Sequence, residues 1–126
     1  MFRSKDNVIY DDLFDVTAAL GTLKAQPAVR QDVFGFFAKD AETNGEEIAF
    51  IYRDRQVEAD KRVGSGEAIL SGDRLYYYLS DGLVSPIATG TFGVDYYFCG
   101  WAKRDAGAAE TVVLMNFDGT RYDEDL

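Results

Sequence analysis

The sequence predicts an all-β fold, either a jelly-roll-like sandwich or a small β-barrel. Short apolar runs alternate with polar residues, and the 12 glycines and 2 prolines fall mostly between these runs. Apolar residues make up 47% of the 126 residues, which is enough for one packed core. We therefore expect a single β domain over residues 15–120, preceded by an extended N-terminal arm (residues 1–14) and followed by an acidic tail (residues 121–126).

The first regularly spaced segment covers residues 12–22, and its pattern is ambiguous. Leu13 and Val16 recur at helical spacing, and an aspartate at position 11 or 12 would cap a helix there. Thr17 and Gly21 interrupt this spacing, so a strand or an extended arm fits nearly as well. Because the rest of the chain offers little helical signal, the prediction stays all-β.

In several later segments apolar and polar residues alternate with the period of two that is typical of β-strands. Strands are expected over residues 47–52, 74–79, 95–102 and 111–117, with weaker candidates at residues 33–38 and 84–88. The alternation places Trp101 on the same face of its strand as Cys99 and opposite Phe98. The expected central packing residues are Leu75, Tyr77, Phe98, Trp101, Val113 and Met115.

The charge of the chain opposes two classes of partner. Thirteen Lys and Arg stand against 22 Asp and Glu, a net charge of −9. Nucleic acids and anionic membranes both attract basic surfaces, so neither is an expected partner. One cysteine permits no internal disulfide, and the sequence starts without the apolar run of a signal peptide. We expect a protein made in a reducing cytoplasm.

Groups for catalysis are scarce. Histidine, the commonest general base and metal ligand, is absent. Cys99 alternates with aromatic residues on an expected strand and is interpreted as a small buried apolar residue. The glycine-rich residues 64–67 and 90–93 lack the ending of a phosphate loop, and the carboxylate clusters do not match a calcium loop. We expect no cofactor, no metal and no enzymatic activity; an enzyme with paired carboxylates is the least favoured alternative.

Two groups of side chains are candidate assembly contacts. The N-terminal stretch mixes charges with the apolar residues Phe2, Val8, Ile9, Tyr10, Leu13 and Phe14, as segments that become ordered on a partner do. The competing interpretation is that this stretch forms the first strand of the domain's own sheet. Tyr76 and Tyr78 share one face of an expected strand, where tyrosines would suit an interface. The competing interpretation is that both faces of that strand are buried.

The segment from about residue 63 to residue 119 carries a series of short motifs. They are Val63-Gly64-Ser65-Gly66-Glu67, Gly72-Asp73-Arg74-Leu75-Tyr76-Tyr77, the turn Asp81-Gly82-Leu83-Val84, Gly100-Trp101-Ala102, the small-residue stretch Ala106-Gly107-Ala108-Ala109 and the run Thr111-Val112-Val113-Leu114-Met115-Asn116-Phe117. This series resembles a family of small tailed-phage head proteins, once described only as a domain of unknown function and now regarded as capsid decoration (cement) proteins. The longer, more charged N-terminal stretch departs from the family pattern.

The resemblance implies a virion structural protein that binds the outer surface of the assembled phage head and stabilises it. Its partners would be the major capsid protein and further copies of itself, as a dimer or trimer. It would be made in the host cytoplasm and end on the outer capsid surface, without contact to nucleic acid or membrane. The alternative function is a carbohydrate-binding or adhesin-type β module, in which aromatic side chains would stack on sugar rings.

Overall fold

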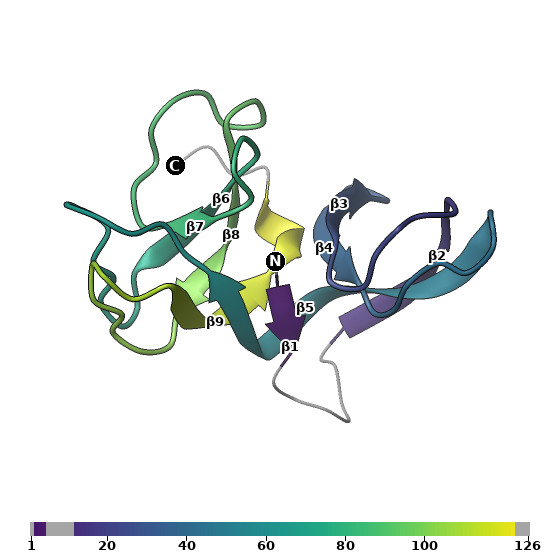
Figure 1. The fold of residues 1–126 in the computed structure, drawn as a ribbon, viewed down its shortest axis with the longest axis horizontal. Coiled ribbons are helices and arrows are strands. Elements are labelled where there is room, and N and C mark those ends of the chain that lie inside the picture. Colours follow the sequence, from purple (N-terminus) through teal and green to yellow (C-terminus); the bar gives the residue numbers. More distant parts are fainter. Residues whose placement is uncertain (1, 5–11, 123–126) are drawn as a thin grey trace.

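The computed structural model describes residues 2–4 and 12–122, and this part of the chain contains nine strands and one short 3₁₀ helix (Figure 1). The elements are β1 (Phe2–Ser4), β2 (Asp12–Ala18), β3 (Pro27–Arg30), β4 (Val33–Phe37), β5 (Glu46–Asp60), β6 (Arg74–Tyr78), β7 (Val84–Ser85), β8 (Tyr96–Ala102), β9 (Val112–Asp118) and η1 (Gly119–Arg121). The ambiguous segment at residues 12–22 is therefore mostly strand. The all-β prediction is confirmed.

The strands form one antiparallel sheet that curls into a half-barrel (Figure 1). Its main path runs β3-β4-β5-β9-β8-β6-β7. A bridge between Lys61 and Val84 brings β7 back to the end of β5. Lys61 is buried there, and its ammonium group donates to the carbonyl oxygens of Arg62, Gly107 and Glu110 at 2.7, 3.2 and 3.1 Å. Buried charges need such partners, and these tie the end of β5 to the β8–β9 connection.

Strand β5 runs through both parts of the molecule (Figure 1). Its first half lies between β2 and β4, and its second half lies between β1 and β9. The register with β9 shifts between Asp54 and Val57, so β5 carries a bulge at this change of neighbours. We call residues 12–52 the small lobe, and residues 2–4 with residues 53–122 the main lobe.

The main core is centred on the ring of Phe2. This ring lies 4.8 Å from Phe117 and 5.4 Å from Tyr77 of the main lobe, and 5.9 Å from both Phe34 and Phe36 of the small lobe, between ring centroids. Aromatic pairs at these separations stabilise a core beyond the apolar area that they bury. Strand β1 therefore joins the two lobes through one side chain.

The prediction of an arm outside the domain is wrong for the described part of residues 1–14. Phe2–Ser4 pairs with residues 57–59 of β5, and Asp12–Ala18 pairs with residues 46–53. Phe2 is only 1% exposed. The apolar side chain expected to seek a partner is buried within its own chain, as the competing interpretation proposed. Residues 5–11 and 123–126 lie outside the described residues.

Most of the predicted packing residues lie in the core. Those that are buried are Leu75, Tyr77, Phe98, Val113 and Met115. Trp101 is only half-buried and lies on the other face of the sheet from Cys99, which corrects its predicted position. The cause is a bulge in β8, and this bulge also shapes the candidate site.

Candidate functional site

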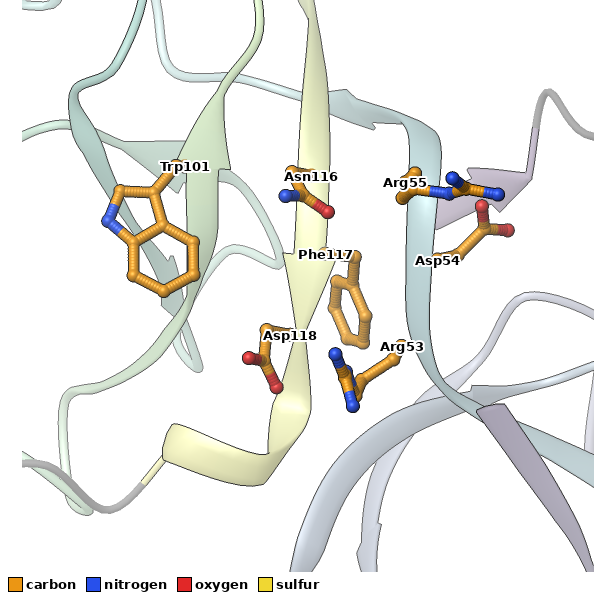
Figure 2. Close-up of a pocket in the computed structure, with 7 residues that line it drawn as sticks. All are labelled: Arg53, Asp54, Arg55, Trp101, Asn116, Phe117 and Asp118. Atoms are coloured by element: carbon orange, nitrogen blue, oxygen red, sulfur yellow. The ribbon is translucent and has the colours of Figure 1, made fainter. Parts of the chain in front are cut away.

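A pocket of about 450 Å³ lies where β5, β9 and β8 run side by side (Figure 2). Its lining residues are Arg53, Asp54 and Arg55 of β5, Trp101 of β8, and Asn116, Phe117 and Asp118 of β9. The volume falls within the range of roughly 300–1,000 Å³ that is typical of ligand pockets. Strand β5 carries a bulge in its pairing with β9, and β8 carries one in its pairing with β6. Bulges commonly re-aim side chains next to functional sites.

The bulge in β8 brings Trp101 to this pocket. The register between β6 and β8 shifts between Phe98 and Gly100, which leaves Cys99 as the extra residue. One extra residue reverses the face on which the following side chains lie. The indole of Trp101 therefore packs against Phe98, with ring centroids 5.0 Å apart and planes at 75°.

Gly100 makes this bulge possible. Its φ of +141° lies in the region that side chains rarely adopt. A Cβ atom there would also lie 2.1 Å from the carbonyl oxygen of Asn116 and 3.0 Å from Cε of Met115. Only glycine fits both the backbone conformation and this close approach of β8 to β9.

The opposite wall is formed by the bulge in β5. Asp54 is 1% exposed, and its Oδ1 accepts a hydrogen bond from the backbone N–H of Gln56 at 3.0 Å. This local turn interrupts the β5–β9 ladder. Arg53 and Arg55 lie on either side of it and are exposed, so two guanidinium groups line this wall.

Strand β9 supplies an amide and a carboxylate between these walls. Asn116 lies opposite Trp101, and Asp118 lies opposite Arg53, as Cα partners. Figure 2 shows the carboxylate of Asp118 on the Trp101 side of β9, whereas the amide of Asn116 lies over the strand itself. Oδ1 of Asp118 accepts from the backbone N–H (3.0 Å) and the hydroxyl (2.5 Å) of Thr120, which fixes the carboxylate at the start of η1.

The predicted assembly contacts do not come together at this pocket. Phe2 is in the main core, and the backbones of Leu13 and Phe14 pair with Ile51 and Phe50 in the small lobe. Val8, Ile9 and Tyr10 lie outside the described residues.

Tyr76 and Tyr78 are 6% and 5% exposed, so neither presents the open surface that a contact needs. They pack with Tyr96 and Phe98 in a separate aromatic cluster. The phenol of Tyr78 donates to the carbonyl of Ile87 and accepts from the N–H of Thr89 at 2.9 Å. The competing interpretation, burial on both faces of the strand, holds here.

The small lobe exposes two leucines that the sequence did not single out. Leu20 is 64% exposed and Leu23 is 55% exposed, on the connection between β2 and β3. The backbone beside them is held to the neighbouring loop: Lys24 N–H donates to Oδ1 of Asp40 at 2.6 Å, and Ala41 N–H donates to the carbonyl of Thr22 at 2.8 Å. We call residues 19–26 the leucine ledge. Leu20 lies in the segment at residues 12–22 that the sequence left ambiguous between helix and strand, so its exposure was not predicted.

The remaining reactive group is enclosed. Cys99 is fully buried, its Sγ donates to the carbonyl of Leu75 at 3.3 Å, and burial raises the pKa of the thiol far above its usual range. Its interpretation as a small buried residue is confirmed. Within residues 2–4 and 12–122, no cluster of three or more potential ligand side chains is placed to hold a metal ion. In the same part of the chain no helix has the length and apolar character to cross a membrane.

Comparisons with known protein families, with curated proteins and with solved structures found no match to this chain.

Proposed function

We propose that this protein is a capsid decoration protein, which binds the outer surface of an assembled phage head and stabilises it without catalysis. The motif series over residues 63–119 supports this proposal through its resemblance to the decoration family. The observation that carries it is the leucine ledge, an exposed apolar surface on an ordered loop.

The ledge has the properties of a protein-docking surface. Exposed leucines at 64% and 55% lie three residues apart, and hydrogen bonds to the neighbouring loop hold the backbone that presents them. A preordered loop loses little conformational entropy on binding, so more of the apolar burial contributes to affinity. Burying each leucine would contribute roughly 1.5–3 kcal/mol.

The mechanism is a thermodynamic linkage. A protein that binds the assembled shell but not its separate subunits stabilises the shell by mass action, and the effect grows with occupancy and affinity. The partners in this proposal are the major capsid protein and further copies of this chain in a dimer or trimer. The location is the outer surface of the virion, after synthesis in the host cytoplasm.

Co-sedimentation tests the proposal. The purified chain is mixed with empty shells assembled from the major capsid protein of the phage that carries its gene, and separately with the unassembled subunits. We expect saturable binding to the shells alone and a higher melting temperature of the decorated shells. Binding to neither form, or equal binding to both, would contradict the proposal.

A pair of variants locates the contact. Leu20→Ser combined with Leu23→Ser should weaken shell binding by at least roughly tenfold, because more than 1.4 kcal/mol of apolar burial is removed. Leu70→Ser is the matched control, since Leu70 is 62% exposed but belongs to the main lobe. Both variants should melt like the wild type. Equal shell affinity of the ledge variant and the control would show that the ledge is not the contact.

A further inference from the structure

The position of Trp101 at the pocket is not the one that strand alternation predicts. The alternation of β8 would place Trp101 beside Cys99, facing the main core, yet the bulge places this large aromatic side chain at the pocket wall. Burying a tryptophan stabilises a core strongly, whereas a bulge breaks ladder hydrogen bonds and here requires glycine at φ +141°. Trp101 therefore packs on Phe98 of the aromatic cluster, and its half-buried side chain also lines the pocket.

The charged residues that line the pocket are balanced in sign, and Figure 2 draws Arg55 and Asp54 at the end of the pocket away from Trp101. Arg53 and Arg55 bring two positive groups, and Asp54 and Asp118 bring two negative groups. The carboxylates disfavour an anion such as phosphate, as does the net charge of −9. The guanidinium groups disfavour a cation in the same way. A neutral ligand is the class that this lining fits best.

The hydrogen-bonding groups narrow the class further. Asp118 only accepts, Arg53 only donates, and Asn116 does both, so donors and acceptors lie next to each other along β9 and β5. Neighbouring hydroxyl groups of a sugar both donate and accept hydrogen bonds, so they can pair with these adjacent donors and acceptors. The apolar face of a sugar ring also matches the apolar body of an indole.

We propose that the pocket between β5, β9 and β8 binds a neutral saccharide, with Trp101 against the sugar ring and Asn116 and Asp118 bonded to its hydroxyl groups. This site is separate from the leucine ledge of the small lobe and does not depend on the capsid role. A decoration protein with such a site would carry a saccharide-binding surface on the virion.

Trp101 is the single tryptophan of the chain, so its fluorescence emission reports on binding in the pocket. The wild-type protein is screened on an array of neutral mono- to tetrasaccharides, and any hit is titrated while the emission of Trp101 is followed. Inorganic phosphate is titrated in parallel. We expect a saturable change in emission with at least one neutral saccharide and none with phosphate.

Two variants and a control assign the binding to the pocket. Asn116→Ala removes an exposed amide, and Asp118→Asn removes the negative charge while keeping an oxygen that can accept from Thr120. Each should weaken saccharide binding at least tenfold without changing the melting temperature. Arg104→Ala, an exposed change on the β8–β9 connection, should leave the affinity unchanged.

Three results would overturn the proposal: no hit on the array, a response to phosphate in place of a saccharide, or a saccharide response that Asn116→Ala and Asp118→Asn leave intact. Shell binding is measured on the same variants. If Asn116→Ala and Asp118→Asn lose saccharide binding but bind shells normally, the two proposals are independent, because the ledge and the pocket share no residue.

Discussion

At the scale of single residues, Gly100 is the position on which the shape of the pocket depends. Replacement by alanine would force a Cβ atom to 2.1 Å from a backbone oxygen of β9 at a φ of +141°. Residues held in such conformations cost on the order of 1–3 kcal/mol each. We expect Gly100→Ala to lower the free energy of unfolding by at least this amount, measured by urea denaturation.

Gly107 provides the matched control for this substitution. It lies on the β8–β9 connection, where an added Cβ would meet only Oε1 of Glu110 at 3.7 Å, an ordinary contact. Gly107→Ala should therefore leave the unfolding midpoint nearly unchanged. If the two variants were equally stable, the bulge in β8 would not depend on its glycine.

At the scale of elements, sequence alternation identified the strands that keep one register over several residues. The runs at residues 74–79, 95–102 and 111–117 became β6, β8 and β9, and residues 47–52 became part of β5. Alternation did not identify β1 and β3, because three or four residues are too few to establish a period. It also did not identify the second half of β5, because a bulge interrupts the alternation of that strand.

The same limit explains the error at the pocket. The side chains after Gly100 lie on the other face of the sheet because β8 contains one extra residue at the bulge. A sequence pattern with a period of two does not reveal such an extra residue. The glycine was visible in the sequence, but its positive φ was not. Asn116 and Asp118 were not singled out as site residues, because their significance depends on which strands lie next to β9. Pairing between strands distant in sequence is information that local patterns lack.

Strand β1 is held to β5 by an ion pair as well as by Phe2. Arg3 donates from Nη2 to Oδ1 of Asp60 at 2.8 Å and from Nη1 to Oδ2 at 3.2 Å, and Glu58 lies beside them. This hydrogen bonding by Arg3 lowers the pKa of Asp60 from 3.8 to about 2. A lowered carboxyl pKa stabilises the folded state fully above pH 3.8, and this contribution is lost as the pH falls toward 2.

Urea denaturation of Asp60→Asn at two pH values checks this linkage. The variant should be less stable than the wild type at pH 5, and the difference should shrink at about pH 2.5 as Asp60 of the wild type becomes protonated. Glu110→Gln, which changes an exposed carboxylate, should show little difference at either pH. A deficit in Asp60→Asn that stayed constant between the two pH values would mean that the ion pair does not contribute.

At the scale of the whole molecule, the two lobes share too much structure to unfold separately. Strand β5 contributes 15 consecutive residues that cross from one lobe to the other. The main core contains Phe34 and Phe36 of the small lobe, and Phe2 contacts both of them together with Phe117. Such a shared core favours a single cooperative transition.

Phe2→Ala tests this coupling at the side chain that joins the lobes. Removing a fully buried phenylalanine costs roughly 3–5 kcal/mol, because lost transfer free energy and a cavity add together. The variant should still unfold in one step, with coincident curves for the emission of Trp101, which reports the main lobe, and for far-ultraviolet circular dichroism, which reports the strands of both lobes. Two separated transitions in the wild type would contradict the shared core. If they separated only in Phe2→Ala, the contacts of this one ring would account for most of the coupling, and β5 alone would not hold the lobes together.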